Sequence, residues 1–493
     1  MTDLGEKSNV KRTTVMLIAL AVAIAYSLAL TLCVLLVRNT DNTSTANTSS
    51  TSSQPIDSIG TDGASSNIDS SGQFNSPLDW SSVNSMESSG GSSSESTESQ
   101  NSSDENTSSE AETPYTKPFT AAIWYSFEDL NFVGYSTVEF KQAIDKMFDD
   151  AVTLGCDAVI VQVRPFADAL YYSNYFPHSS ILSGTQGVDP GYDALDYMVK
   201  AAHNRDLQIH AWLNPYRVTL WTDDYNSLSN DHIVRKWMTD DNSANDRNVL
   251  KWESRLYFNP AILEVHDLIL NGVREIVKNY DVDGIHIDDY FYPSTTPVGD
   301  DFDKPEYNTY VKNGGKLSLG DWRRNNVSTL VSGIYRVIKD IDSSVVFGVS
   351  PAYNISKDGI DDNYQKKYAD LKKWMSTAGY IDYIVPQLYF GYNYSKFEIT
   401  YDYLLNLWMS MPRHKNMKIY IGLAAYKIGD AQADLASGEW IADDDILARQ
   451  TIDAMQIGCD GVMIFNYSTI MSADELTTAQ RENLKEVLNN DPR

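Results

Sequence analysis

The sequence predicts an α/β protein, a (β/α)8 barrel (TIM barrel), preceded by a transmembrane helix and a disordered linker. Eight short apolar runs alternate strictly with amphipathic stretches between residues 117 and 493, as strands and helices do in such a barrel. Several units repeat one local order, in which a helix is followed by a glycine or tyrosine, an aspartate and a strand. No glycine-rich phosphate loop follows the first run, which favours a closed barrel over a doubly wound open sheet.

The N-terminal segment predicts a single membrane-spanning helix. Residues 13–37 carry no charge over a length that can cross a bilayer, and basic residues within 1–12 predict a cytoplasmic N-terminus. A cleaved signal peptide is an alternative, but its apolar stretch is usually shorter. A lipoprotein signal ending at Cys33 is another, although Leu32 is not the small residue that such a signal requires. We therefore expect a single-pass signal anchor in the cell membrane, with the barrel extracellular.

Residues 38–116 are predicted to be a disordered linker. Ser, Thr, Asn and Gly dominate the segment, and large apolar residues are scarce. Such a composition cannot bury enough apolar surface to offset the entropy lost on ordering. A flexible chain of this length has a root-mean-square span of roughly 50 Å. We expect it to let the catalytic domain, 117–493, work at a distance from the membrane.

Each expected strand is an apolar run, and each expected helix has an amphipathic pattern. The strands are expected at 119–127, 157–165, 207–215, 282–290, 344–351, 380–390, 417–426 and 459–468. The helices are expected at 136–155, 192–206, 260–279, 321–340, 361–378, 396–411, 442–457 and 474–489. The first helix has clear end signals, with Ser136 or Thr137 as N-cap, Glu139 nearby and Gly155 at its end.

Charge and composition argue against several classes of partner. The net charge of −28 argues against nucleic acid, because phosphate binding needs clustered Lys and Arg. No C-x-x-C pair or Cys/His cluster indicates zinc. The acidic clusters at 300–303, 358–362 and 443–445 do not fit the spacing of a calcium loop. We therefore expect no metal and no cofactor.

Polar and aromatic residues gather where the predicted strands end, which is where barrel enzymes carry their active sites. Polar residues at alternate positions of Val- and Ile-rich strands are costly to bury without partners. Aromatic rings suit the apolar faces of sugars, so the rim predicts a polysaccharide cleft, although many of these rings could simply pack loops onto the barrel. The candidate substrate-binding residues are Arg164, His210, Trp212, Asn214, His286, Tyr290, Gln387, Tyr389 and Asn466.

The fourth predicted strand, within DGIHIDDY, carries the leading catalytic candidate. Ile285 and Ile287 share one face of a strand, and His286 and Asp288 share the other. We expect the isoleucines to pack against helices and Asp288 to be the last residue that faces the barrel interior. A carboxylate there can act as nucleophile or stabilise an oxocarbenium-like centre. His286 either donates to Asp288 or is a satisfied core histidine.

Hydrolysis of a glycosidic bond needs a second carboxylate, and three candidates stay open. Asp289 is favoured, but it faces outward and bonds a loop unless the strand has ended before it. Asp168 follows the second strand and can instead pair with Arg164. Glu253 lies in a loop on the side of the third strand. Arg323 and Arg324, in the first turn of the helix after the fourth strand, are expected to reach the site or to form surface ion pairs.

The DGIHIDDY segment also resembles two known patterns, each incompletely. It looks like the chitinase-type D-G-x-D-x-D-x-E pattern, but Tyr290 stands in place of the acid Glu and His286 in place of an Asp. It is similar to the fourth strand of α-amylase-type barrels, with Asp288 at the nucleophile position. The fifth strand, VVFGVSP, has no carboxylate to supply the acid of that family. A chitinase-like hydrolase is therefore the lesser alternative.

A more extensive likeness covers the whole predicted barrel, over roughly 118–490. It is carried by VQVRPFADALYYS (161–173), IHAWLNPYRV (209–218), LYFNPAILEVHDLI (256–269), VDGIHIDDYFYP (282–293), DWRRNNV (321–327), FGVSPAYN (347–354), IDYIVPQLYF (381–390) and GVMIFNYS (461–468). In these segments the chain resembles the bacterial glycosyl-hydrolase-like family 10 proteins, which are barrel proteins often kept at the cell surface. The resemblance implies a glycoside hydrolase acting on an extracellular glycan, with bacterial wall glycan favoured.

Together these features predict an extracytoplasmic glycoside hydrolase that cleaves a cell-surface or wall polysaccharide, for example the peptidoglycan glycan, by carboxylate acid/base chemistry. A membrane-tethered, non-catalytic carbohydrate-binding protein on the same barrel is the alternative, because the fifth strand lacks an acid. An esterase or deacetylase is disfavoured, since neither a metal-binding His/Asp set nor a G-x-S-x-G motif is present.

Overall fold

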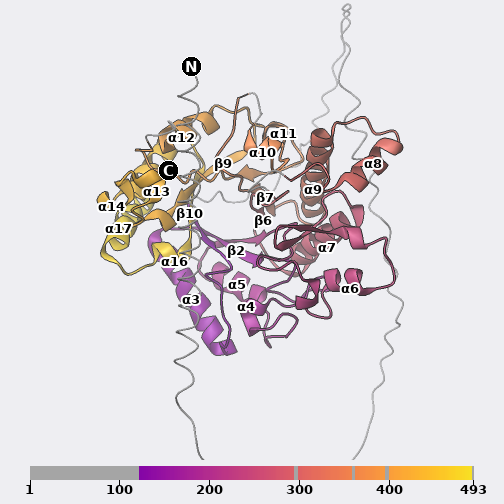
Figure 1. The fold of residues 1–493 in the computed structure, drawn as a ribbon. Helices are drawn as coiled ribbons and strands as arrows, with labels where there is room; N and C mark the ends of the chain where they lie inside the picture. Colours follow the sequence, from indigo (N-terminus) through magenta and orange to yellow (C-terminus); the bar gives the residue numbers. More distant parts are fainter. Residues whose placement is uncertain (1–120, 294–297, 358–360, 395–398, 491–493) are drawn as a thin grey trace, which may run out of the picture. The chain divides into compact units, whose positions relative to one another are not determined.

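The computed structural model describes residues 121–293, 298–357, 361–394 and 399–490. Eight parallel strands close into a barrel in the order β1-β10-β9-β8-β7-β6-β3-β2, which confirms the predicted fold class. Each strand lies within a predicted range, and Figure 1 shows several of them at the centre with helices around them. The barrel strands are β1 (Ala121–Tyr125), β2 (Ala158–Arg164), β3 (Gln208–Leu213), β6 (Gly284–Ile287), β7 (Val346–Val349), β8 (Tyr383–Ile384), β9 (Lys418–Ala424) and β10 (Gly461–Phe465).

Helices connect the strands, and one predicted helix is broken in two. The main helices are α3 (Thr137–Leu154), α5 (Ala194–His203), α7 (Leu263–Asn279), α9 (Leu319–Ile341), α12 (Tyr401–Met409), α15 (Ile446–Gln456) and α17 (Glu475–Asn489). The range 361–378 contains α10 (Asp362–Gln365) and α11 (Leu371–Ser376), because Tyr368 between them has a left-handed φ of 55°. The shorter helices are α4 (Ser180–Ser183), α6 (Ile233–Thr239), α8 (Lys304–Lys312), α13 (Ala433–Ala436), α14 (Glu439–Ala442) and α16 (Tyr467–Ile470).

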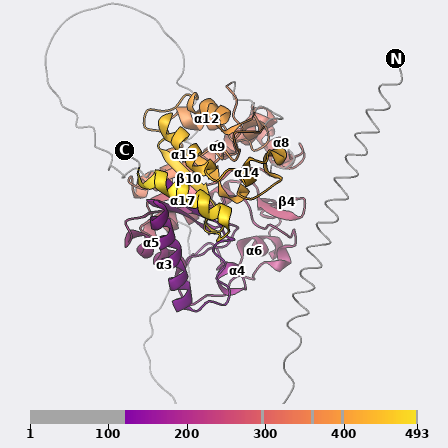
Figure 2. The ribbon, with the colours of Figure 1, turned by 90° about the vertical axis from the view of Figure 1, so that its left-hand side faces the viewer.

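Helix α3 confirms its predicted end signals. Ser136 and Glu139 form a reciprocal capping box, and Gly155 closes the helix with a φ of 100°. Its buried residues face the barrel, and in Figure 2 it lies beside α17, with which it is in contact. The amphipathic pattern therefore produces the expected outer helical layer.

The barrel has two apolar layers, which follow from strand alternation. Outward-facing residues, among them Ile285 and Ile287, join the large core between the strands and the helices. Inward-facing residues form a separate interior cluster, which consists of Ala122, Trp124, Ala158, Ile160, Trp212, Tyr383, Val385, Tyr420 and Met463. The predicted parity of the fourth strand is therefore confirmed for the isoleucines.

The long connection between β3 and α7 contains a hairpin that the sequence pattern did not predict. Strands β4 (Val249–Trp252) and β5 (Arg255–Phe258) pair antiparallel, and Glu253 lies in the turn between them with a φ of 53°. The backbone of Val218 and Thr219 bonds to Leu256, which fastens the start of the connection to the hairpin.

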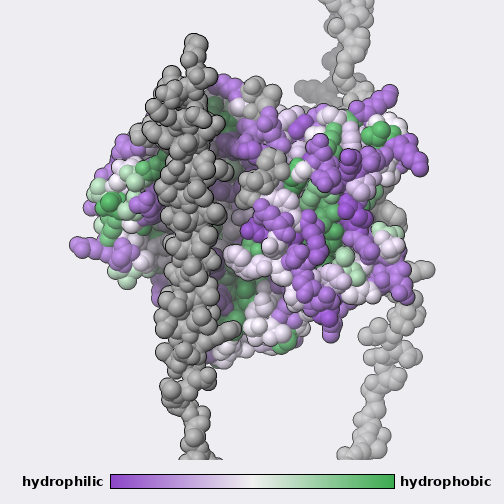
Figure 3. All heavy atoms as spheres, in the orientation of Figure 1, coloured by the Kyte–Doolittle hydropathy of each residue, from purple (hydrophilic) through white to green (hydrophobic). Residues whose placement is uncertain are grey.

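Within the described ranges, no helix is long and apolar enough to cross a bilayer. The predicted anchor at 13–37 and the predicted linker at 38–116 lie outside the described residues. Hydrophilic side chains are prominent on the face of the barrel domain seen in Figure 3, with apolar side chains in scattered spots. Cys156 and Cys459 are both buried.

Candidate active site

Asp288 lies at the carboxyl end of β6, directly after the last paired residue, Ile287. Its side chain is buried, with 4% of the residue exposed, and accepts hydrogen bonds from Trp212 Nε1 at 3.1 Å and from Asn214 Nδ2 at 3.4 Å. The backbone N–H of Tyr290 donates to Asp288 Oδ1 at 3.2 Å, which turns the chain at the end of the strand. The predicted inward position of Asp288 at the rim is thus present, with two of the predicted rim residues bonded to it.

The environment of Asp288 favours its protonated form. Burial, and after it the negative charge of Asp289, raises the pKa of Asp288 to about 7. The Arg217 guanidinium, the Tyr290 N–H and the Trp212 N–H act in the opposite direction on this pKa, with smaller effects. Near neutral pH the carboxyl group can therefore both hold and release a proton, as a general acid must.

Asp289 is the second carboxylate at this strand end, and it forms an ion pair with Lys367. Lys367 comes from the chain between α10 and α11, which follows β7, the fifth barrel strand. The predicted condition for Asp289 is met, because β6 ends at Ile287 and the chain then turns. Both side chains are largely buried, with 11% of Lys367 and 19% of Asp289 exposed. The connection that follows the fifth strand thus places a cation beside Asp289.

Arg217 and Tyr290 form one wall beside Asp288. The Arg217 guanidinium lies 4.9 Å from the ring centroid of Phe166 and 4.5 Å from that of Tyr290. Its Nε and Nη2 donate to the carbonyl of Pro165 at 3.3 and 3.2 Å, which fixes its plane. Sequence reasoning missed Arg217, because an arginine in a long loop carries no periodic signal.

Tyr389 forms the other wall, after β8. Its ring stacks on Phe465 with centroids 5.9 Å apart and meets the edge of Tyr426 at 5.7 Å. Burial raises the pKa of Tyr389 well above its usual value, and the nearby acidic groups, Asp288 and Asp289 among them, add to this. The site therefore lies between loops that follow β3, β6, β7, β8 and β9.

Gln387 and Asn466 hold neighbouring strand ends together. Gln387 Nε2 donates to the backbone carbonyl of Ser350 at 3.1 Å, which ties the end of β8 to that of β7. Asn466 Nδ2 donates to Asp129 Oδ2 at 3.0 Å, which ties the end of β10 to the loop after β1. Both predicted residues therefore stabilise the rim by linking neighbouring strand ends.

Beneath Asp288, the barrel floor is a chain of hydrogen bonds. Trp124 Nε1 donates to His286 Nε2 at 3.4 Å, so the proton of a neutral His286 ring belongs on Nδ1. That Nδ1 lies 3.0 Å from the Tyr383 hydroxyl, which lies 2.8 Å from His210 Nδ1. Burial lowers the pKa of His286 well below its usual value and that of His210 to about 4. His286 is therefore a satisfied core histidine, and donation to Asp288 is not among its hydrogen bonds.

Two glycines make room for this chain. A Cβ at Gly284 of β6 would come within 2.6 Å of the His210 ring, and a Cβ at Gly348 of β7 would overlap the Tyr383 ring. Both approaches are far below van der Waals contact, so any side chain at these positions would displace a ring of the floor.

Arg164 lies on the outer face of the barrel, which corrects its predicted place at the rim. Strand β2 has one residue more than β3 between two successive pairs, so Val163 forms a bulge. Such a bulge turns the next side chain to the other face. The Arg164 guanidinium is buried 4.5 Å from the Phe176 ring, and a Cβ at Gly272 of α7 would come within 2.5 Å of Nη1. Arg164 thus packs under α7 and has no access to a substrate.

The other two candidate carboxylates have separate surroundings. Asp168 is buried after β2, where Gln186 donates to it at 2.9 Å, and burial raises its pKa to about 6. The expected pairing of Asp168 with Arg164 is wrong, because the bulge directs Arg164 to α7. Glu253 is exposed at the tip of the β4–β5 hairpin. Asp289 is therefore the carboxylate that the structure places next to Asp288.

A buried ion pair supports the loop behind the site and corrects the expectation for Arg323. Arg323 and Asp303 are almost fully buried and are bonded through Nε at 3.0 Å. Arg323 Nη1 donates to the Tyr368 hydroxyl at 2.8 Å, and the Tyr292 hydroxyl donates to Asp303 at 2.9 Å. Arg323 thus neither reaches the site nor lies on the surface. Through Asp303 and Tyr368 it connects the loop after Asp289 to the loop that carries Lys367.

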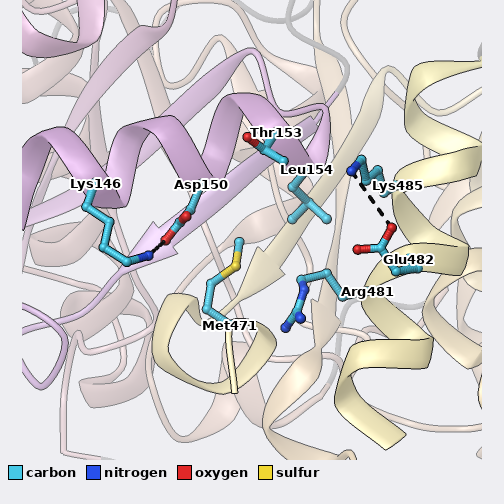
Figure 4. A pocket seen from close by; sticks show the side chains of 8 residues that line it. All are labelled: Lys146, Asp150, Thr153, Leu154, Met471, Arg481, Glu482 and Lys485. Carbon is cyan, nitrogen blue, oxygen red and sulfur yellow. Dashed lines mark hydrogen bonds and ion pairs between the residues drawn. The ribbon is translucent and has the colours of Figure 1, made fainter. Parts of the chain in front are cut away.

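A separate pocket lies in the helical layer, and the candidate residues do not line it (Figure 4). Its volume is about 230 Å³, and its lining comes from α3, α17 and Met471. The charged side chains pair locally, Lys146 with Asp150 at 2.6 Å and Lys485 with Glu482 at 3.8 Å. Across the described part of the chain, no group of three or more His, Cys, Asp or Glu side chains is placed to hold a metal ion.

Known proteins match most of the barrel. The family described as "Glycosyl hydrolase-like 10" matches residues 121–441. Glycosyl hydrolase YngK of Bacillus subtilis (strain 168) is 40% identical over 312 residues, which are 60% of this chain and 58% of that protein. Glycosyl hydrolase DigH of Escherichia coli (strain K12) is 37% identical over 321 residues, which are 61% of this chain and 69% of that protein. The chain thus spans less than two thirds of the length of YngK.

Solved barrels are more distant. The glycoside hydrolase domain of PgaB (BpsB) from Bordetella bronchiseptica is 11% identical with a TM-score of 0.47, over 75% of this chain and 99% of that one. The endo-1,4-beta-mannanase from Rhizomucor miehei is 12% identical with a TM-score of 0.45, over 75% and 95%. These likenesses are too weak to bear on activity. The family match spans more than half of the chain and confirms the resemblance seen in the sequence: the chain belongs to the glycosyl hydrolase-like 10 family.

Proposed function

We propose that this protein is a membrane-anchored, extracytoplasmic glycoside hydrolase that cleaves glycosidic bonds of bacterial wall polysaccharide. The observation that carries the proposal is the carboxyl group of Asp288, buried at the end of β6 with a pKa raised to about 7 and with a second carboxylate beside it. Membership of a glycosyl hydrolase-like family supports the reaction class. The uncharged segment 13–37 and the Ser/Thr-rich segment 38–116 support an extracellular place for the barrel.

In the proposed mechanism, Asp288 is the proton donor. Its protonated carboxyl group gives a proton to the glycosidic oxygen as the bond to the anomeric carbon breaks. Trp212 and Asn214 then stabilise the carboxylate that remains, through the hydrogen bonds that they already donate to it. The raised pKa thus favours an acid at this position, in place of the nucleophile that the strand pattern suggested.

Asp289 is the proposed second carboxylate. Its ion pair with Lys367 holds one oxygen and leaves the other for water or for the anomeric carbon. Acting as base, Asp289 takes a proton from water while the hydroxyl adds to the anomeric carbon. Acting as nucleophile, it forms a glycosyl ester that water then hydrolyses. Proton NMR of the first-formed anomer distinguishes the two, because the first route inverts the configuration and the second retains it.

The test uses the full-length chain and bacterial wall glycan stripped of its peptides, with new reducing ends as the readout. Asp288→Asn and Asp289→Asn are each expected to lower the rate by about 10²- to 10⁴-fold. Asp223→Asn, at a half-exposed surface ion pair, is the matched control and should match the unmodified protein. Near-normal rates in Asp288→Asn would refute the assignment.

A non-catalytic carbohydrate-binding protein on the same barrel is the second candidate. The observation that favours it is the ion pair of Asp289 with Lys367, because a carboxylate held by a cation is less available for catalysis. Binding of the stripped glycan without release of reducing ends, at any pH tested from acidic to mildly alkaline, would favour this candidate over the hydrolase.

A further inference from the structure

Two aromatic clusters stand at the mouth of the barrel. The first, here called the Tyr290 cluster, is Phe166, Arg217 and Tyr290, stacked in that order with centroid distances of 4.9 and 4.5 Å from the guanidinium. Tyr290 is its outermost member and is 43% exposed. The stacked guanidinium behind the ring holds the ring plane in place.

The second, here called the Tyr426 cluster, is Tyr389, Phe465 and Tyr426. Tyr389 and Phe465 stack with an interplanar angle of 25°, and Tyr426 stands on their edges at 82° and 85°. Tyr426 follows β9 and is 44% exposed, whereas its two partners are largely covered. A ring exposed on a rigid aromatic base is unusual for a core residue and typical of a binding platform.

The strand order places the two clusters on opposite sides of the mouth. The members of the Tyr290 cluster follow β2, β3 and β6, and those of the Tyr426 cluster lie at or after the ends of β8, β9 and β10. In the closed strand order, β7 separates the two sets on one side and β1 on the other. Asp288 follows the same strand as Tyr290, so one exposed aromatic ring stands next to the proposed acid and the other lies across the mouth from it.

The electrostatics of Tyr389 agree with this arrangement. After burial, the groups that raise its pKa are Tyr426 from one cluster, Asp289 and Asp288 from the centre, and Tyr290 from the other cluster. Residues of both clusters and both carboxylates are therefore near enough to the Tyr389 hydroxyl to act on its pKa.

We infer that the mouth binds an internal segment of a glycan chain, with one sugar ring on Tyr290 and another on Tyr426 and the scissile bond at Asp288 between them. The inference rests on the proposed function and assigns an endo mode of cleavage to it. Sugar rings have apolar C–H faces that pack on aromatic rings, and a chain-end enzyme needs only one such platform. With exposed rings on both sides, the chain can continue past the acid in both directions.

The test is titration calorimetry on full-length protein carrying Asp288→Asn, with peptide-free wall-glycan fragments that range from disaccharides to octasaccharides. We expect affinity to rise with fragment length, and the added change Tyr426→Ala to weaken binding of the long fragments about tenfold while sparing the shortest. Tyr426→Phe keeps the ring and should restore the affinity. Tyr403→Ala on α12, at a tyrosine 52% exposed, is the matched control and should have no effect.

Product lengths supply the second readout. The unmodified protein should release fragments of mixed length from the start, because internal bonds are cut at many positions. A single short product from the earliest time point would overturn the inference, and so would equal loss of affinity for fragments of every length, or none, in Tyr426→Ala. These outcomes would not contradict the proposed hydrolase activity. Failure to release any product would refute that activity, and the binding titration would then test on its own whether Tyr290 and Tyr426 bind sugar rings.

Discussion

Replacing Asp288 by asparagine should remove turnover and at the same time make the barrel more stable, relative to the unmodified protein, as the pH rises. In the folded protein burial raises the pKa of Asp288 to about 7, from an ordinary value of 3.8. Between these values the unfolded chain releases the proton while the folded protein keeps it, so the unmodified protein loses stability as pH increases. The amide of the Asp288→Asn variant does not titrate, and the variant escapes this loss.

The magnitude follows from the two pKa values. Their difference, about 7 minus 3.8, is worth at most about 4 kcal/mol of unfolding free energy at about 1.36 kcal/mol per unit. The asparagine side chain turns an N–H towards the donors Trp212 and Asn214, which lowers the stability of the variant by about 1–3 kcal/mol at every pH. The prediction therefore concerns how the difference in unfolding free energy between the two proteins changes with pH, and not the size of that difference at one pH.

The assay is urea unfolding of both proteins at several pH values between about 3 and 9. The stability difference, variant minus unmodified protein, should be flat below about pH 4, rise through about pH 7 and be flat again above it. A difference independent of pH, or one that falls as pH rises, would refute the buried, protonated carboxyl. Hydrolysis by the unmodified protein should decline above about pH 7, as its acid ionises.

Three further predictions concern single contacts. Trp212→Phe removes a donor to Asp288 and should move the alkaline limb of the pH–rate profile upward by up to about one unit, as measured on stripped glycan; an unmoved limb would argue against this hydrogen bond. Lys367→Met leaves the largely buried Asp289 without its cation and should lower stability by about 3 kcal/mol in urea unfolding, with Lys367→Arg restoring most of it. Asp474 caps α17, and its hydrogen bonds, of which that from the Thr477 N–H has the largest effect, lower its pKa to about 2. The ionised carboxylate therefore adds to the unfolding free energy above pH 3.8, and this stabilisation is lost as pH falls through about 2. The stability gap between the unmodified protein and Asp474→Asn should accordingly narrow as pH falls from about 5 to about 2, opposite in sign to Asp288→Asn.

The strands and the rim position of Asp288 could be predicted because both follow from periodicity. An apolar run between amphipathic stretches identifies a buried parallel strand, and a period of two then decides which side chains face inward. Asp288 needed nothing more than this. The same rule failed at Arg164, because a one-residue bulge at Val163 reverses the alternation of inward- and outward-facing side chains. The sequence AVIVQVR contains no residue that predicts the position of this bulge.

The partner of Asp289 could not be predicted for a different reason. Lys367 is 78 residues away in the chain and lies in a segment where the predicted helix is broken at Tyr368. The pairing depends on how two loops fold over the barrel mouth, and the buried Arg323–Asp303 pair that fixes them is equally non-local. Charged residues in loops carry no period, so sequence reasoning left Arg323 between two roles, neither of which it has.

The hydrogen-bonded floor of the barrel has a direction, and this limits how the site can change during evolution. The Trp124 indole can only donate, so the order from Trp124 through His286 and Tyr383 to His210 cannot be reversed. Exchange of any one member for a side chain of the wrong donor type leaves a buried group unsatisfied, and Gly284 and Gly348 leave no space for a larger neighbour to compensate. Relatives that lack one of these residues should therefore differ at several of these positions together. If the floor is kept, the loops above it can change and bind different glycans without moving the proposed acid.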